Sequence, residues 1–235
     1  MTRDQVLKKI YKGLIVSCQA LESEPLYGSE IMAKMAIAAE KGGAVGIRAN
    51  YSADIKAIKE AVDLPIIGLI KREYPGYEVY ITPTLREVEE VVAAGAHIVA
   101  IDATDMSRPG NKSASEFIYE IKKKFDIMVM ADVSTYEEGI RAQDAGADIV
   151  STTMSGYTPY SPKSEGPDFE LIRNLSSDLT VPLIGEGRIW EPKEAVKALE
   201  LGAYAIVVGT AITRPMNITK RFTEAIAQAR ANDGA

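Results

Sequence analysis

Two ionisable residues, Lys71 and Glu186, stand where apolar segments end. Lys71 closes the apolar run in IIGLIKRE (66–73), which is typical of a strand buried on both faces, and Glu186 lies between glycines in GEGR (185–188). A lysine withdrawn from water loses part of its preference for the charged form and can act as a base. If the two residues share a pocket, they could exchange a proton with a bound molecule. The alternatives are a lysine whose ammonium reaches water at a rim, and a carboxylate that only pairs with Lys71 or Arg188.

Glycines and an arginine near the C-terminus indicate an anion site. The segments GEGR (185–188) and VVGTAITRP (207–215) place glycines after apolar runs, where backbone N–H groups can approach a phosphate. Arg214 would add a positive charge and a two-pronged hydrogen-bond donor. A glycine in such a place often only makes a turn, but two such loops together favour phosphate binding. The residues predicted to hold the phosphate are Gly187, Arg188, Gly209, Thr210 and Arg214.

Repeated strand and helix units must position these residues. Four segments share one pattern, in which a helix stops at a glycine before an apolar run: EKGGAVGIRAN (40–50), AAGAHIVAIDAT (93–104), DAGADIVSTT (144–153) and ELGAYAIVVGT (200–210). Eight apolar runs alternate with helical patterns, over 13–20, 44–50, 65–72, 97–104, 127–134, 148–153, 182–188 and 205–212. Eight such units predict a single (β/α)8 TIM barrel domain over residues 1–235. The segment DQVLKKIYK (4–12) would be an extra N-terminal helix that closes the barrel floor.

A doubly wound open sheet is the alternative architecture. It would place a glycine-rich dinucleotide turn after the first strand, and this chain has SCQA (17–20) there instead. In a barrel, the active site forms at the C-terminal ends of the strands, so the polar residues that end the apolar runs become candidates together. They are Gln19, Arg48, Asn50, Lys71, Arg72, Glu73, Asp102, Thr104, Asp132, the segment 151–153, Glu186, Arg188, Thr210 and Arg214.

The composition limits the partners and the kinds of site. The chain of 235 residues carries a formal net charge of −6, which argues against nucleic acid and against a basic membrane-binding surface. The sequence shows neither an apolar segment long enough to span a membrane nor the apolar core of a signal peptide, so we expect a cytoplasmic protein. Cys18 permits no internal disulfide and, with His97 alone, offers no zinc cluster, so we expect no metal.

Long motifs in a fixed order connect the chain to a known family: SCQA (17–20), GIRAN (46–50), GLIKREYPGYEVYITPT (68–84), AIDAT (100–104), ADVST (131–135), TTMSGYT (152–158), GEGRI (185–189) and VVGTAITRP (207–215). Over nearly its whole length the chain resembles the N-acetylmannosamine-6-phosphate 2-epimerases of sialic acid catabolism. The resemblance implies a phosphosugar-binding barrel that interconverts N-acetylmannosamine 6-phosphate and N-acetylglucosamine 6-phosphate without an organic cofactor. It implies catalysis by Lys71 and Glu186, substrate positioning by Gln19, Arg48 and Asp132, and phosphate binding by Arg214 and the loops of Gly187 and Gly209.

The residue types fit an inversion at C2 of a 2-acetamido sugar. This inversion removes a proton from carbon and returns it to the opposite face, so it needs a base in near contact and a cation or donor for the developing charge. Our hypothesis places Lys71 and Glu186 on opposite sides of C2, but one residue could perform both transfers, or a substrate hydroxyl could relay the proton. Two other functions stay open: a lyase that forms an imine with Lys71, and a phosphosugar-binding protein without catalysis. By family analogy we also expect a homodimer, in which the helical pattern at 218–231 could dock on a partner.

Overall fold

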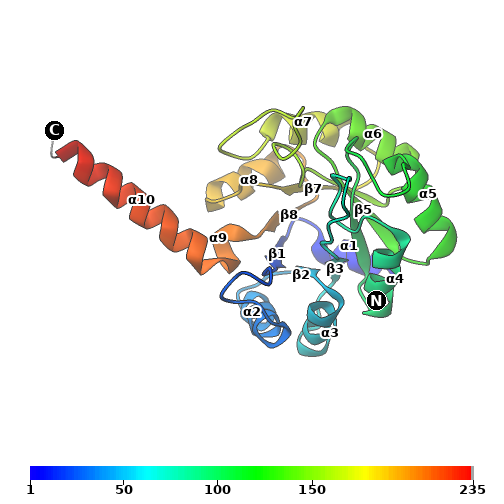
Figure 1. Cartoon of the computed structure of the whole chain (residues 1–235), viewed down its shortest axis with the longest axis horizontal. Coiled ribbons are helices and arrows are strands. Elements are labelled where there is room, and N and C mark those ends of the chain that lie inside the picture. Colours follow the sequence, from blue (N-terminus) through cyan, green and yellow to red (C-terminus); the bar gives the residue numbers. More distant parts are fainter. Residues whose placement is uncertain (234–235) are drawn as a thin grey trace.

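The computed structural model describes residues 1–233 and forms a closed barrel of eight parallel strands in chain order (Figure 1). The strands are β1 (Leu14–Cys18), β2 (Gly46–Asn50), β3 (Ile66–Leu69), β4 (Ile98–Asp102), β5 (Met128–Asp132), β6 (Ile149–Ser151), β7 (Leu183–Glu186) and β8 (Ala205–Val208). The helices are α1 (Arg3–Ile10), α2 (Ser29–Lys41), α3 (Ser52–Ala61), α4 (Leu85–Ala93), α5 (Ala114–Lys124), α6 (Tyr136–Asp144), α7 (Phe169–Asp178), α8 (Pro192–Glu200), α9 (Thr210–Thr213) and α10 (Pro215–Asp233). The predicted (β/α)8 TIM barrel is confirmed. The expected runs extend beyond the strands, most of all the eighth, which was expected to stay extended to residue 212 and instead turns into α9 after Gly209.

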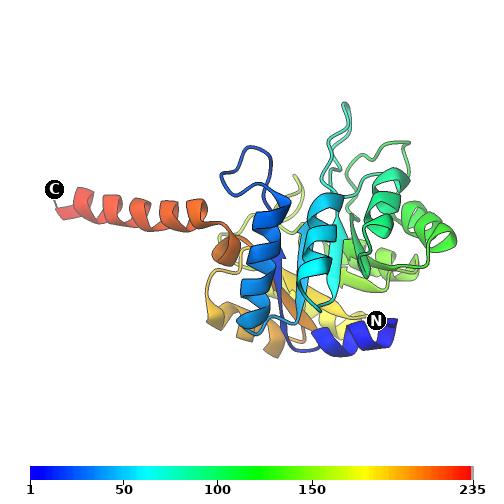
Figure 2. The ribbon, with the colours of Figure 1, turned by 90° about the horizontal axis from the view of Figure 1, so that it is seen from below.

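The alternation of side chains along each strand separates the barrel interior from the layer under the helices. Ile15, Ile98 and Met130 belong to the apolar cluster that fills the interior, and Val6 and Ile10 of α1 join the same cluster. The extra N-terminal helix therefore closes one end of the barrel, as predicted, and Figure 2 shows it crossing that end. Because the interior is apolar from the floor upwards, charged side chains are concentrated at the opposite end.

Local signals in the sequence fix where the outer helices begin and end. Thr84, Ser113 and Thr135 each cap a helix start through a capping box, in which the hydroxyl accepts a backbone N–H and a glutamate three residues later caps in return. After α4 and α6, Gly95 and Gly146 have φ angles of 85° and 98°, which glycine adopts without the strain of a side chain. These short, well-defined connections hold neighbouring strands in register, so their polar C-terminal residues arrive at one level.

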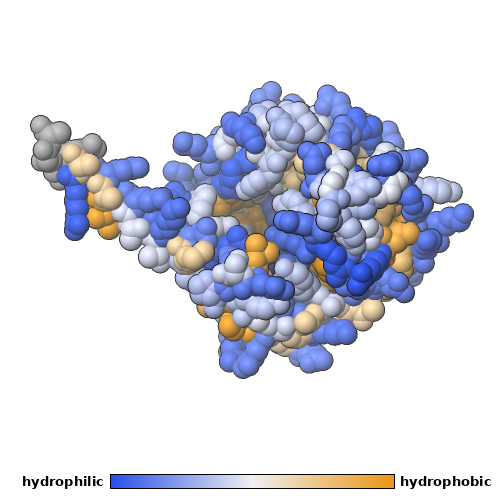
Figure 3. Space-filling view, viewed as in Figure 1, coloured by the Kyte–Doolittle hydropathy of each residue, from blue (hydrophilic) through white to orange (hydrophobic). Residues whose placement is uncertain are grey.

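The last helix, α10, does not return to the barrel. Figures 1 and 2 show it projecting outwards from α9, while its sequence carries apolar side chains on one face. Phe222 and Ile226 are 67% and 53% exposed, and Figure 3 shows apolar patches along this helix among hydrophilic neighbours. The place beside β1 that an eighth barrel helix would cover is an apolar groove of about 290 Å³, lined by Leu14, Val16, Met35, Ala38, Ala39, Gly42, Ala44, Ile212 and Thr213.

Candidate active site

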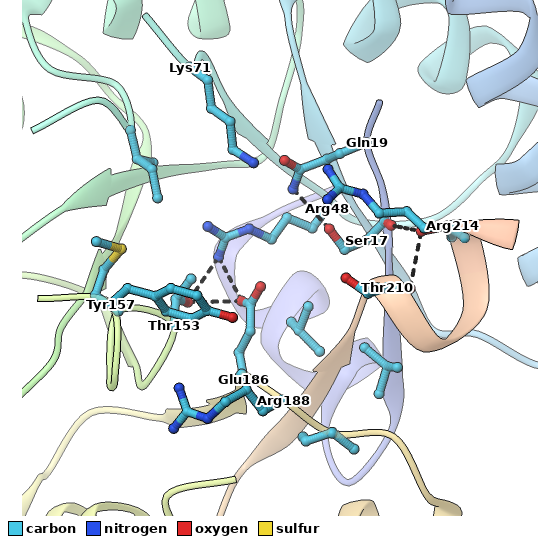
Figure 4. Close-up of a pocket in the computed structure, with 18 of the residues that line it drawn as sticks. Ser17, Gln19, Arg48, Lys71, Thr153, Tyr157, Glu186, Arg188, Thr210 and Arg214 are labelled. Carbon is cyan, nitrogen blue, oxygen red and sulfur yellow. Dashed lines mark hydrogen bonds and ion pairs between the residues drawn. The ribbon is translucent and has the colours of Figure 1, made fainter. Parts of the chain in front are cut away.

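The C-terminal ends of the strands enclose a cavity of about 450 Å³, drawn in Figure 4. All the predicted site residues except Asp132 line it: Gln19, Arg48, Lys71, Glu186, Gly187, Arg188, Gly209, Thr210 and Arg214. They come from β1, β2, β3, β7 and β8 and from the loops that follow these strands. The cavity therefore lies at the end of the barrel where (β/α)8 enzymes carry their active sites.

The guanidinium of Arg48, which lies in β2, contacts two carboxylates. Its Nη1 and Nη2 donate to Asp132 Oδ1 and Oδ2 at 3.0 and 2.6 Å, and Nη1 also donates to Glu186 Oε2 at 2.8 Å. Thr153 Oγ1 lies 2.8 Å from Asp132 Oδ1 and 2.9 Å from Glu186 Oε2. Burial by itself would lower the pKa of Arg48, but the two carboxylates raise it above its usual value. Arg48 thus places a permanent positive charge at the base of the cavity.

Glu186 is the carboxylate of this group that lines the cavity. Burial raises its pKa, with a further contribution from the neighbouring charge of Asp132, while Arg48, Thr153 and Lys71 oppose the shift. A carboxyl group with a raised pKa binds and releases a proton closer to neutral pH than an ordinary glutamate does. Glu186 therefore has the position and the acidity expected of a group that takes part in proton transfer.

Lys71 approaches the cavity from the other side. Its backbone N–H donates to Asn50 Oδ1 at 2.9 Å, and a bridge to Ile81 fixes the chain just after β3. Figure 4 shows the side chain pointing into the cavity, where its amine has no hydrogen-bond partner among residues 1–233. Burial, followed by the positive charges of Arg48 and Arg214, lowers the pKa of Lys71 to about 8. Near that pH, a large fraction of the amine is neutral and can accept a proton.

The loops after β7 and β8 form an anion corner, which consists of Gly187, Gly209, Thr210 and Arg214. Gly187 has a φ of 111°, which disfavours any side chain there. A Cβ atom on Gly209 would lie 3.2 Å from the Cβ atom of Ser17, so the crowded backbone favours glycine. The backbone N–H groups of Gly187, Gly209 and Thr210 donate to no acceptor within residues 1–233 and so remain available to a ligand. Together with the Arg214 guanidinium, these groups can bind an anionic oxygen.

Two predicted site residues lie differently from the expectation. The Arg188 guanidinium leaves the cavity, because its Nε donates to Gly166 O at 2.8 Å and its Nη1 donates to Ser155 O (Figure 4). Only the backbone of Arg188, which has a φ of 54°, could contact an anion bound at the anion corner. Asp132 is fully buried beneath Arg48 and does not line the cavity. Its contacts make it a partner of Arg48 and Thr153, so its effect on a bound molecule would be indirect.

The cavity also contains residues that the sequence prediction did not assign. Thr153 was within the strand-end segment 151–153 but received no role of its own, although its hydroxyl contacts both carboxylates. Tyr80 and Tyr157 reach the cavity from the loops after β3 and β6, and Ser17 accepts a hydrogen bond from Gln19 Nε2 at 2.8 Å. A polar residue two positions before Gln19 on a strand points to the same side, and this spacing could have identified Ser17. No comparable signal exists for tyrosines in long loops.

The described residues 1–233 contain no group of three or more His, Cys, Asp or Glu side chains placed to hold a metal ion. Within the same range, no helix is both long and apolar enough to cross a membrane. The charged groups that line the cavity are Glu186 and the cationic side chains of Arg48, Lys71 and Arg214. This excess of positive charge favours a small anionic ligand.

Comparisons with known proteins agree with this site. The family model described as "Putative N-acetylmannosamine-6-phosphate epimerase" matches residues 32–228. A relative named "Putative N-acetylmannosamine-6-phosphate 2-epimerase" from Caldanaerobacter subterraneus subsp. tengcongensis is 62% identical over 226 residues, which cover 96% of this chain and 95% of the relative. A protein of the same name from Clostridioides difficile is 51% identical over 221 residues, covering 94% of this chain and 99% of that protein.

A solved structure with the same fold has a related name. The N-acetylmannosamine-6-phosphate 2-epimerase from Clostridium perfringens superposes with a TM-score of 0.92 at 51% sequence identity. The match covers 96% of this chain and 98% of that chain, so the barrel and the loops around the cavity are shared. The chain belongs to the N-acetylmannosamine-6-phosphate 2-epimerase family.

Proposed function

We propose that the chain interconverts N-acetyl-D-mannosamine 6-phosphate and N-acetyl-D-glucosamine 6-phosphate in N-acetylneuraminate degradation. The observation that carries the proposal is Lys71, whose partly buried amine has a pKa lowered to about 8 and lines one cavity with Arg48 and Glu186. The anion corner supplies a place for the 6-phosphate on the same cavity wall as β7 and β8. The names of the relatives support the same reaction.

The chemistry assigns a role to each charged group around C2. In the open-chain sugar the C2 proton lies next to the aldehyde, so its removal leaves negative charge on the C1 oxygen. Lys71 takes this proton as the neutral amine, and the fixed charge of Arg48 stabilises the enolate. Glu186 returns a proton to the opposite face of C2, and the two residues exchange roles in the reverse direction. Proton transfer of this kind requires no organic cofactor.

Substrate positioning completes the proposed mechanism. Gln19 lines the cavity beside Arg48, and Asp132 holds the Arg48 guanidinium through two hydrogen bonds. The phosphate, bound by Gly187, Gly209, Thr210 and Arg214, lies far from the reacting carbon. Its binding energy can therefore be used to fix C2 between Lys71 and Glu186.

Proton NMR in heavy water tests this function directly. Wild-type protein should convert N-acetylmannosamine 6-phosphate to the gluco epimer with loss of the C2 proton signal. The number of residues is tested from the gluco epimer, for which the proposed base Glu186 carries a single proton. Deuterium in the product alone at early conversion then supports transfer between two residues, whereas early deuterium in both epimers contradicts it. The Lys71→Met variant should be inactive, and Lys123→Met, an exposed lysine of α5, should match the wild type. Absence of conversion by the wild type would reject the epimerase, and borohydride trapping of an adduct on Lys71 would indicate a lyase.

The proposed partner of the chain is a phosphosugar, and the proposed compartment is the cytoplasm. A sugar phosphate does not cross a lipid bilayer unaided, so its enzymes act where it is produced. The cavity suits such a ligand, because Arg48, Lys71 and Arg214 line it. The net charge of −6 fits neither nucleic acid nor an anionic membrane surface as a partner.

We propose further that the chain is a homodimer in which α10 of each copy covers the groove beside β1 of the other. Every residue of α10 from Thr219 to Ala231 is exposed, and Phe222 and Ile226 share one apolar face. The groove between α2 and α9 is apolar, and it lies where a (β/α)8 barrel has its eighth helix. In a symmetric dimer, α10 of each copy would fill the groove of the other copy. This exchange would bury both the apolar face of α10 and the apolar groove.

Light scattering after size-exclusion chromatography tests the dimer. The wild type should have twice the mass of the chain, and Phe222→Glu should shift it to the monomer. Gln228→Glu introduces the same charge on another face of α10 and serves as the control. A monomeric wild type, or a Phe222→Glu variant that stays fully dimeric, would contradict the exchange of α10.

A further inference from the structure

Glu24, in the loop between β1 and α2, forms an ion pair with Arg214 of the anion corner. Glu24 Oε2 lies 3.1 Å from Arg214 Nη2, and the two side chains are 14% and 26% exposed. The same Oε2 atom accepts the backbone N–H of Leu21 at 2.7 Å, and Glu24 N donates to Leu21 O at 2.8 Å. The loop is therefore folded into a turn that holds the carboxylate inward instead of leaving it in solvent.

Glu24 and a bound phosphate would compete for one guanidinium. A phosphate on Arg214 brings negative charge next to the Glu24 carboxylate, and like charges at such distances repel each other. Glu24 also acts on the rest of the site, because its charge raises the pKa of Lys71 while that of Arg214 lowers it. The pair thus lies within electrostatic reach of the proposed base, at the edge of the cavity.

The surroundings leave space for the loop to move away. A second cavity of about 310 Å³ lies between the loop and the start of α10, lined by Glu24, Pro25, Leu26, Met216 and Thr219 among others. Gln19, Thr213 and Arg214 line both cavities, so the two spaces meet at the arginine. Displacement of Glu24 towards this space breaks one ion pair and the turn contacts of Leu21, and leaves the barrel unchanged.

We propose that Glu24 is a specificity-determining residue, which neutralises Arg214 in the empty site and gives way only to an anion that binds Arg214 more strongly. The proposal rests on the proposed function in taking Arg214 as a phosphate ligand. A phosphate dianion that also uses the N–H groups of Gly187, Gly209 and Thr210 displaces the carboxylate. A carboxylate or a neutral sugar has fewer charges or fewer acceptors and does not. Glu24 therefore makes the site selective for phosphorylated sugars, at the cost of weaker phosphate affinity.

The test measures binding of inorganic phosphate to the full chain by isothermal titration calorimetry. Glu24→Gln should bind phosphate about two- to fivefold more tightly than the wild type, which is the affinity equivalent of one partly exposed ion pair. Glu22→Gln removes the same charge from an exposed position of the same loop and should leave the affinity unchanged. Tighter binding cannot arise from a damaged fold, so the direction of the effect is informative. Unchanged or weaker phosphate binding by Glu24→Gln would overturn the proposal.

A second pair of variants separates this proposal from the epimerase assignment. Arg214→Gln should weaken phosphate binding, and adding Glu24→Gln to it should have no further effect, because the shared partner is gone. If Arg214→Gln leaves phosphate affinity unchanged, Arg214 is not the phosphate ligand and the role of Glu24 is refuted. Epimerisation in heavy water is a separate measurement, so the phosphate-binding result does not decide whether the chain is an epimerase. Acetate affinity should gain more from Glu24→Gln than phosphate affinity does, because selectivity is the ratio of the two affinities, and an equal or smaller gain for acetate would overturn the role of Glu24 in specificity.

Discussion

Replacing Asp132 with asparagine tests the buried charge network beneath the cavity. The substitution keeps the shape of the side chain but removes the charge that faces Arg48 across two hydrogen bonds of 3.0 and 2.6 Å. Arg48 is 1% exposed and Asp132 is fully buried, so water cannot replace the lost interaction. Breaking a buried ion pair by removing one partner typically costs about 3–5 kcal/mol.

The same substitution on the surface provides the control. Asp105 also pairs with an arginine through both carboxylate oxygens, since Arg141 Nη2 lies 2.7 Å from each, but its side chain is 62% exposed. An exposed pair of this kind contributes about 0.2–1 kcal/mol. Asp132→Asn and Asp105→Asn therefore differ mainly in burial, and any difference in unfolding measures its effect.

Scanning calorimetry at pH 7.5 is the assay. A loss of 3–5 kcal/mol lowers the melting temperature of a chain of this size by about 6–20 °C, and the surface variant should lose less than about 4 °C. Asp132→Asn should also lose turnover, because Arg48 keeps only Glu186 and Thr153 to orient it. Equal melting temperatures for the two variants would refute the conclusion that burial makes this network strong.

Three further predictions concern the proposed chemistry. The kcat/KM should fall at both pH extremes with one inflection near pH 8, because the pKa of Lys71 is lowered to about 8 and the base must be neutral while the proposed acid Glu186 still holds its proton; a profile without an inflection near pH 8 would exclude Lys71 as the base. Gly209→Ala should weaken the binding of inorganic phosphate, measured by calorimetry, because the added methyl group lies 3.2 Å from the Cβ atom of Ser17 and crowds the anion corner. Thr153→Val should cost about 1–3 kcal/mol in urea unfolding, because it removes the hydroxyl beside Glu186 without changing its volume, and a fully stable variant would contradict this.

The sequence was most informative where short-range rules govern the structure. A helix that stops at a glycine before an apolar run is a local pattern that marked four of the units, and the apolar runs themselves located all eight strands. Barrel geometry then places every strand end at one level, so Lys71 and Glu186 could be brought together without any knowledge of the side-chain packing. The register between parallel strands determines which strand-end residues are neighbours, for example Asp102 and Asp132.

Side-chain direction was harder to predict, because it depends on contacts far along the chain. Arg188 follows Glu186 by two residues, but a left-handed backbone turns its guanidinium to carbonyl groups of the loop after β6. Asp132 ends its strand like the other candidates, but it is fully buried, with its carboxylate against Arg48 and Thr153. Tyr80 and Tyr157 come from loops without periodicity, so no sequence rule placed them.

The closing of the barrel by its first and last strands has a consequence for how the protein is made. Leu14 pairs with Ile206, so this contact joins residues from almost opposite ends of the chain. The cavity has the same requirement, because Ser17 and Arg214 belong to one wall. During synthesis, neither the closed barrel nor the complete cavity can form before the last strand has left the ribosome. Contacts of such long range also make folding slow, so we expect nascent chains that end before β8 to be inactive and prone to aggregation.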